Sequence, residues 1–206
     1  MTYCCRHCFV LIKTKKGDTM YKIYENCPVF HNEKITLRFT NEEDTLELLN
    51  CYSDEKAVPL FNSDNCNGDT FFYTTPERMK QGIDFWQFSY ETKQFVRMTI
   101  ILNSTNEIIG TVEMFNRGAA PFYGVHGVLR IDVMSKYEEE DVLRAVLELA
   151  HVHFYQEFGV EWIVTKAVSD AVIRRETLAK LGYIPMKSFA LDHYYGRGEH
   201  ENRNPF

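Results

Sequence analysis

The sequence predicts an α/β protein with a mixed central sheet and helices on both of its faces. Two observations lead to this prediction. Strand-like and helix-like segments alternate along the chain, and a buried strand at 127–134 passes through one sharp turn into an amphipathic helix at 135–150. Strands that alternate with helices are typical of a sheet covered on both faces. A predicted hairpin around 103–106 adds antiparallel pairing to the same sheet.

The first strand is predicted over Lys34–Thr40, where apolar and polar side chains alternate with the period of a half-buried strand. Asn41 follows as an N-cap, and the acidic residues directly after it are typical of a first helical turn. The stretch 52–73 is rich in Asp, Asn, Ser and Gly and is predicted to be a long surface connection. Thr75 and Pro76 then open a second helix as its cap and first residue.

Two β-rich runs, Val96–Leu102 and Glu107–Phe115, are predicted to form an antiparallel hairpin. The next stretch, 116–127, contains glycines and a proline and is predicted to be a loop before the strand and helix of 127–150. The remaining predicted elements are a strand at Trp162–Val168, a helix that ends near Leu181 before Gly182, and a last strand near Phe189–Tyr195.

The turn at 135–141 has the outline of a phosphate-binding corner without glycines. The first N–H groups of a helix lie at the positive end of its dipole and favour anions, and glycines let a phosphate approach that backbone. Here four consecutive carboxylates, Glu138–Asp141, stand in the turn instead. Ser135 and Glu138 have the spacing of a capping box, so we expect the corner to close its helix end without a ligand.

Composition limits the class of protein. A length of 206 residues with 45% hydrophobic content indicates one full-sized core. The net charge of −6 and the pI near 5.7 disfavour nucleic-acid binding. No apolar run approaches the ~18 residues needed to span a bilayer, and the short apolar run near the N-terminus is followed by lysines. We therefore expect a soluble, cytoplasmic protein that binds neither nucleic acid nor membrane.

The cysteines lie in the first third of the chain, at Cys4, Cys5, Cys8, Cys27, Cys51 and Cys66. That distribution does not suit a disulfide framework that fastens a whole fold, so reduced thiols are expected. The N-terminal group of three cysteines and His7 has ligand types that suit zinc, but no second pair follows it, so no metal is expected. Residues 1–29 are interpreted as a cysteine-rich N-terminal extension, and 30–206 as one domain.

Three short motifs occur in a specific order: ITLRFTNEED at Ile35–Asp44, IIGT at Ile108–Thr111 and LAKLGY at Leu178–Tyr183. In this order the chain resembles the GNAT superfamily of acyl-CoA-dependent N-acetyltransferases, and most closely the branch of ribosomal-protein alanine N-acetyltransferases. The first motif is similar to that branch's "LR...eeD" opening and the last to its "leklGF" ending. The resemblance covers about residues 30–195 and implies a GNAT-like fold.

The resemblance implies transfer of an acetyl group from acetyl-CoA to an amine, on a small molecule or a peptide N-terminus. In the family, the pantetheine arm lies between two splayed central strands and the pyrophosphate rests on the turn that follows. The family motif of that turn, Gln/Arg-x-x-Gly-x-Gly/Ala, aligns with Glu138–Leu143. The residues assigned to acetyl-CoA in this way are Val133, Glu138, Glu139, Glu140, Asp141, Val142, Leu143 and Arg174.

The aligned turn departs from the family motif at its three marked positions, which hold Glu138, Asp141 and Leu143. Carboxylates close to the phosphates of CoA would repel them, so weak or altered cofactor binding is expected. Cations that could compensate are Lys136, Arg144, Arg174 and Arg175, because arginine suits bidentate phosphate contact. The alternative interpretation is that these arginines form a solvated helix face, and that the apolar residues after Asp141 are helix core.

Glu113 and Asp132 are the candidate catalytic residues. Acetyl transfer needs a deprotonated amine, and both carboxylates lie on predicted strands beside the expected acceptor site, so either could act as a base directly or through water. The alternative is that both simply pair with a neighbour or face solvent. The tyrosine that many family members use as an acid aligns with Leu178, and Tyr155 or Tyr183 could replace it.

Three functions stay open from the sequence: an N-acetyltransferase, a non-catalytic binding or regulatory protein that kept the fold and lost CoA, and a metal-dependent interaction protein that uses the N-terminal cysteines. A homodimer is possible. An opening between the strands before Ser135 and after Val160 would favour the first function, because a pantetheine arm needs that space.

Overall fold

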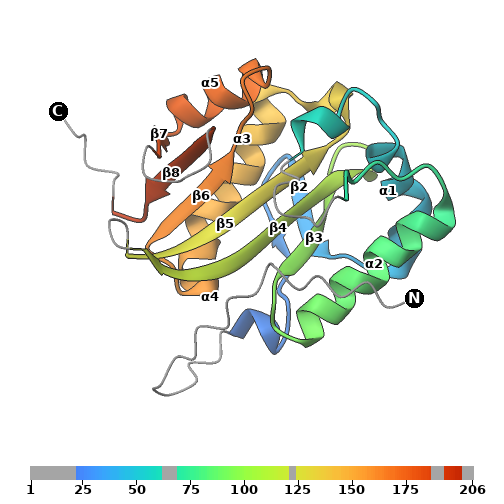
Figure 1. The fold of residues 1–206 in the computed structure, drawn as a ribbon, viewed down its shortest axis with the longest axis horizontal. Coiled ribbons are helices and arrows are strands. Elements are labelled where there is room, and N and C mark those ends of the chain that lie inside the picture. Colours follow the sequence, from blue (N-terminus) through green and yellow to red (C-terminus); the bar gives the residue numbers. More distant parts are fainter. Residues whose placement is uncertain (1–21, 62–68, 121–123, 187–192, 201–206) are drawn as a thin grey trace.

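A mixed sheet of eight strands runs through the residues that the structure describes, which are 22–61, 69–120, 124–186 and 193–200. The structure is a computed structural model of the chain. The strands are β1 (Phe30–His31), β2 (Ile35–Phe39), β3 (Val96–Leu102), β4 (Glu107–Ala120), β5 (Gly124–Val133), β6 (Trp162–Lys166), β7 (Ile184–Pro185) and β8 (Tyr194–Gly198). Their order across the sheet is β1-β2-β3-β4-β5-β6-β8-β7 (Figure 1).

Neighbouring strands pair antiparallel from β1 to β5, and β8 pairs antiparallel with both β6 and β7. The pair of β5 and β6 is parallel, because helices between them carry the chain back across the sheet. The predicted α/β class with a mixed sheet is therefore confirmed.

The α-helices are α1 (Thr45–Tyr52), α2 (Pro76–Glu91), α3 (Glu140–Leu149), α4 (Tyr155–Phe158) and α5 (Val172–Lys180). Short 3₁₀ turns are η1 (Lys22–Tyr24), η2 (Glu42–Asp44), η3 (Val58–Leu60) and η4 (Ser135–Tyr137), and η5 (Ala150–Phe154) is a π-helical segment that joins α3 to α4. The helices α1 and α2 lie apart from α3 and α5 in Figure 1.

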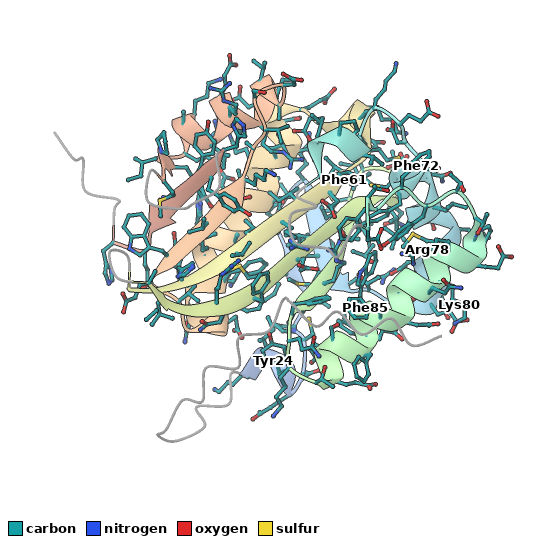
Figure 2. All side chains as sticks on the ribbon, in the orientation of Figure 1. Tyr24, Phe61, Phe72, Arg78, Lys80 and Phe85 are labelled. Atoms are coloured by element: carbon teal, nitrogen blue, oxygen red, sulfur yellow. The ribbon has the colours of Figure 1, made fainter. Side chains whose placement is uncertain are left out.

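The helices cover both faces of the sheet, as predicted. Alternate residues of β3, Val96, Met98 and Ile100, belong to a core that also contains α3 residues and Leu178 of α5. A second core holds the buried sides of α1 and α2. The outer side of α2 faces away from that core, and Phe85, labelled in Figure 2, is 50% exposed there.

Two predicted helix caps are confirmed. The Asn41 side chain accepts a hydrogen bond from the Glu43 N–H, and the Asp44 carboxylate accepts one from the Asn41 N–H, which completes a capping box. The Thr75 hydroxyl accepts from the Arg78 N–H, with Pro76 at the first helical position. Both caps satisfy donors that the first helical turn leaves unpaired.

The predicted capping box of Ser135 and Glu138 is wrong. Residues 135–137 form the 3₁₀ turn η4, and α3 begins only at Glu140, after an N-cap, Glu139, whose side chain makes no capping bond. The Glu138 carboxylate instead binds the guanidinium of Arg174, which is 36 residues away in the chain. A distant charge therefore outcompetes the local backbone for this side chain.

The loop predicted at 116–127 is also wrong. β4 continues to Ala120 and β5 begins at Gly124, so the hairpin of β4 and β5 is longer than expected. The register shifts between Asn116 and Gly118, so Arg117 has no paired residue on β5, and Gly118, next to this bulge, has a φ of 88°. A glycine at a β-bulge fits a strand, and the sequence pattern does not distinguish it from a loop glycine.

The predicted N-terminal extension and the predicted last strand lie only partly within the described residues. β8 begins at Tyr194, so the last strand lies later than predicted, and most of the predicted range falls outside the described residues. The N-terminal cysteines and His7 also lie outside them. Within the predicted extension, Ile23 is fully buried in the core and its carbonyl accepts a hydrogen bond from Tyr90.

Candidate functional site

The parallel strands β5 and β6 pair over only part of β5. Their last paired residues are Leu129 and Thr165, although β5 continues to Val133. We call the unpaired side of residues 130–133 that faces β6 the β5 edge. Backbone groups on an unpaired strand edge can bind an extended ligand by main-chain hydrogen bonds. The β5 edge leads directly to the corner at 135–141.

The side chain of Arg174 binds to the β5 edge. Its Nη1 donates to the carbonyl oxygen of Ile131 at 2.9 Å and to that of Leu60 at 3.3 Å. Its Nε and Nη2 donate to the two carboxylate oxygens of Glu138 at 2.8 and 2.7 Å. Arg174 is 2% exposed and Glu138 is 8% exposed, so this is a buried bidentate ion pair.

Two other carboxylates of the corner, Glu140 and Asp141, have partners at the surface. Glu140 pairs with Lys180 and Arg144, and Asp141 pairs with Lys34. These partners lower the pKa of Glu140 and of Asp141. The repulsion expected between this turn and an anion is therefore weaker than the sequence alone indicates, because neighbouring cations offset two of its charges.

Three of the residues that the resemblance assigns to acetyl-CoA are core residues next to the corner. Val133, Val142 and Leu143 are buried in the core between the sheet and α3. The N–H of Ser135 donates to the carboxylate of Asp54 at 2.7 Å. Burial acts to raise the pKa of Asp54, but this hydrogen bond and others from the backbone lower it overall. A carboxylate of the protein thus accepts a backbone N–H of the turn for which the sequence predicts a phosphate-binding corner.

The structure brings the two candidate catalytic residues together around Arg97. Arg97 lies opposite Glu113 on β3 and β4, and Asp132 lies on β5, on the same face of the sheet. Arg97 donates to Glu113 Oε2 from Nη2 at 2.5 Å and to Asp132 Oδ2 from Nη1 at 2.9 Å. Arg130 approaches Glu113 Oε1 at 3.2 Å. Arg97, Glu113 and Asp132 are each at most 2% exposed.

Aromatic side chains from the α1 and α2 side cover this charged cluster. The Tyr52 hydroxyl lies 2.8 Å from the hydroxyl of Thr111 and donates to Asp132 Oδ2 at 3.0 Å. The guanidinium of Arg97 lies 4.4 Å from the ring centroid of Trp86, a cation–π contact. The rings that surround Tyr52 are Phe61, Phe71, Tyr73 and Trp86.

Glu113 and Asp132 differ in how many of their carboxylate oxygens have a partner. Both oxygens of Glu113 face a guanidinium, and although burial acts to raise its pKa, Arg97 and Arg130 lower it overall. In Asp132, Oδ2 accepts from Tyr52 and Arg97, whereas Oδ1 is buried and has no hydrogen-bond partner among the described residues. Asp132 therefore keeps a buried acceptor that Glu113 lacks.

The residues considered as catalytic acids lie elsewhere. Leu178 is buried in the core, Tyr155 donates to the Arg197 carbonyl oxygen, and Tyr183 contacts His151 Nε2 at 3.0 Å. Lys136 binds Glu107, and Arg175 binds the hydroxyl of Tyr195, so neither contacts a corner carboxylate. Among the four candidate compensating cations, Arg174 and Arg144 are the ones that bind residues of the corner.

The described residues contain neither a candidate metal site nor a membrane-spanning helix. No group of three or more His, Cys, Asp and Glu side chains there could hold a metal ion. No helix in this part of the chain is long and apolar enough to cross a membrane. Its two cysteines, Cys27 and Cys51, are free thiols, and burial raises the pKa of both.

Comparison with solved structures identifies the fold. The structure resembles the ribosomal-protein-S5-alanine acetyltransferase from Vibrio fischeri with a TM-score of 0.64 over 85% of this chain and 99% of that one, at 16% sequence identity. The chain has the GNAT fold. The predicted resemblance to this superfamily is thereby confirmed at the level of structure. No family model matches the sequence, and no curated protein matches it.

Two further GNAT-fold neighbours were solved with CoA. Mycobacterium smegmatis RimJ, in complex with CoA-disulfide, gives a TM-score of 0.63 at 12% identity and covers 80% of this chain and 81% of that one. RimL, a ribosomal L7/L12 α-N-protein acetyltransferase in complex with CoA, gives 0.60 at 11% identity and covers 83% of this chain and 98% of that one.

The sequence did not reveal the central role of Arg97. In the GNAT-fold sheet it stands between two apolar core residues of β3, Val96 and Met98, which is the ordinary pattern of a half-exposed strand. Only the lateral order of β3, β4 and β5 brings it beside both carboxylates. Its position on a predicted strand next to the one that holds Glu113 is the one signal that could have indicated it.

Proposed function

We propose that this GNAT-fold protein is an N-acetyltransferase that uses acetyl-CoA and acts on a primary amine of a small molecule or a peptide N-terminus. The observation that carries the proposal is the β5 edge, where the parallel pairing of β5 and β6 stops after Leu129 and Thr165. The structural neighbours include two proteins solved with CoA, which supports the same donor.

The backbone of the β5 edge suits a pantetheine arm. Such an arm carries amide groups, which can donate to and accept from an unpaired strand as a further strand would. The carbonyl oxygen of Ile131 is one acceptor on this edge, and Arg174 binds it in this structure. The edge therefore fits the arm when Arg174 moves off that oxygen. Acetyl-CoA would supply the acyl group as a thioester, which an amine attacks directly.

Asp132 is the proposed general base. It follows Ile131 in β5, so its carboxylate lies one residue from the proposed donor-binding edge. Its Oδ1 atom is available to accept a proton from the acceptor ammonium, while Tyr52 and Arg97 hold Oδ2 in place. Glu113 is proposed as a positioning residue that fixes Arg97, because its own oxygens face Arg97 and Arg130.

The experiment is acetyl transfer from acetyl-CoA to a panel of peptide N-termini and small primary amines, measured for the wild type and for Asp132→Asn. The amide retains a hydrogen-bond acceptor for Tyr52 and removes the basic oxygen. We expect kcat/KM to fall by about 10²–10⁴-fold, with the dissociation constant of CoA unchanged. Full activity of the variant would exclude Asp132 as the base, and no turnover of any amine by the wild type would overturn the proposed function.

A second candidate function is a non-catalytic binding or regulatory protein with the GNAT fold. The buried pair of Arg174 and Glu138 at the β5 edge favours it, because these side chains fill the position that the donor needs. This function predicts that CoA at about 1 mM leaves the thermal unfolding temperature unchanged, whereas a ligand at 100 times its dissociation constant stabilises by about 2.7 kcal/mol.

A further inference from the structure

The guanidinium of Arg174 makes four hydrogen bonds around the β5 edge and the corner. One side donates to the carbonyl oxygens of Ile131 and Leu60, and the other donates to both oxygens of Glu138. It therefore connects the β5 edge, the turn η3 and the corner. A fork of this kind binds a phosphate with the same geometry as a carboxylate.

Glu138 differs from the other carboxylates of the corner. Glu140 and Asp141 pair with lysines and an arginine at the surface and are partly exposed, whereas Glu138 is turned inward onto Arg174. Glu139 is exposed. Glu138 is thus the carboxylate of this turn that competes directly for the buried cation.

A second protein anion lies at the same turn. The carboxylate of Asp54, which follows α1, accepts the N–H of Ser135 at 2.7 Å. Two groups here could bind an anion: the Arg174 guanidinium and the Ser135 N–H. Both are bound to carboxylates of the protein itself. In the free protein these carboxylates therefore take the hydrogen bonds that an anionic ligand would otherwise accept.

We propose that Arg174 is the residue that binds the phosphates of the acyl donor, and that Glu138 is an internal competitor that holds Arg174 on the β5 edge until the donor displaces it. This inference rests on the proposed function, since it concerns the same donor. When the pair separates, the carbonyl oxygen of Ile131 is released for the pantetheine arm, and the guanidinium is released for phosphate. Donor binding and the opening of the β5 edge are then one event.

The test is the dissociation constant of CoA, measured by calorimetry for the wild type, Glu138→Gln and the matched control Glu139→Gln. Both variants remove one negative charge from adjacent positions of the same turn. We expect Glu138→Gln to bind CoA about tenfold tighter or more, because a charge-assisted bond to Arg174 no longer has to be broken. We expect Glu139→Gln to change the constant by less than about twofold.

Pantetheine, which has no phosphate, separates the two parts of the proposal. Its affinity is expected to rise less in Glu138→Gln than that of CoA, because it gives Arg174 no phosphate to bind. The double variant Glu138→Gln with Arg174→Gln leaves no unpaired charge in the core, which favours folding. It is expected to bind CoA no tighter than pantetheine. Circular dichroism confirms that each variant is folded.

The outcomes distinguish this inference from the proposed function. An equal gain in both single variants, or no gain in Glu138→Gln, overturns the competition between Glu138 and the donor, even if the wild type acetylates amines. A gain in Glu138→Gln alone, without turnover of any amine, supports the inference and overturns the proposed function. Absence of CoA binding by the wild type and by Glu138→Gln at about 1 mM overturns both.

Discussion

Arg38 binds both carboxylate oxygens of Asp44, its neighbour six residues along the chain, with Nη1 to Oδ2 at 2.9 Å and Nη2 to Oδ1 at 2.5 Å. The hydroxyl of Thr99 on β3 donates to the same carboxylate at 2.7 Å, and Asp44 is 1% exposed. The motif that resembles "LR...eeD" therefore has a structural role, because it ties β2 and β3 to the start of α1.

The first prediction follows from that contact. Replacing Asp44 by Ala removes the capping-box acceptor and the carboxylate that Arg38 and Thr99 bind. We expect the free energy of unfolding in urea to fall by about 2–3 kcal/mol, because charge-assisted hydrogen bonds are lost while the partly exposed Arg38 can turn to water. The control is Glu43→Ala on the same turn, whose side chain is exposed, and it should cost less than about 1 kcal/mol. Similar losses in the two variants would contradict the prediction.

Arg97 gives the second prediction. Its replacement by Met leaves Glu113 and Asp132 buried near each other, with Arg130 as a remaining cation for Glu113. We expect a loss of about 3–5 kcal/mol in the free energy of unfolding, because an uncompensated buried carboxylate is costly. The control, Lys80→Met on α2, removes the exposed ion pairs of Lys80 with Glu42 and Asp84, and it is expected to leave the free energy of unfolding nearly unchanged (Lys80 is labelled in Figure 2). A loss for Arg97→Met no larger than that of the control would show that the cluster is solvated.

The parts of the molecule that sequence predicted well are those whose signals are local. The alternation in β2 and the caps at Asn41 and Thr75 depend on residues within one or two turns of each other. The longer β4–β5 hairpin was not predictable in this way, because Gly118 has the same composition signal in a bulge as in a loop.

The corner shows why site prediction was less complete than fold prediction. Ser135 and Glu138 have capping-box spacing, but Arg174, on α5, changes what Glu138 does. Likewise, Asp132 and Glu113 were selected for their strands, whereas the arginine between them comes from a third strand. Contacts that join distant segments follow from strand order, and the alternation of side chains in a single strand does not contain that information.

The third prediction concerns pH. Burial, with a smaller contribution from the charge of Arg197, lowers the pKa of His151 to about 3. The unfolded chain, with a histidine pKa near 6.5, therefore binds more protons than the folded protein between about pH 3 and 6.5, so this residue makes stability fall as the pH decreases through that window. The contribution is about 2 kcal/mol between pH 7 and pH 5.

Urea unfolding at pH 7 and pH 5 measures this effect. His151→Gln should show a pH-dependent loss smaller than that of the wild type by about 2 kcal/mol. Tyr183→Phe removes the hydroxyl that contacts His151 but keeps its burial, so it should retain most of the wild-type pH dependence. Identical pH dependence in His151→Gln and the wild type would show that this imidazole is accessible to protons in the folded protein.

The last prediction concerns Gly110, which pairs with Val133 beside the β5 edge. A Cβ atom there would lie 2.0 Å from the carbonyl oxygen of Asp132 and 2.8 Å from the Cα of Val133, so Ala forces β4 and β5 apart. We expect Gly110→Ala to lower the free energy of unfolding by about 3 kcal/mol, at the upper end of overpacking effects. It should also shift the backbone amide resonances of residues 131–133.

Gly182→Ala is the matched control for that substitution. Gly182 has a φ of 80°, but its nearest neighbour to an added Cβ would be Arg197 Nε at 3.8 Å, so the change adds backbone strain without a clash. We expect it to cost about 1 kcal/mol and to leave the resonances of 131–133 in place. The methyl group added at Gly110 displaces the strand that holds Ile131 and Asp132. The proposed function therefore predicts that folded Gly110→Ala lacks acetyl transfer and CoA binding and that Gly182→Ala has both. Retention of CoA binding by Gly110→Ala would indicate that the donor does not depend on the position of this strand.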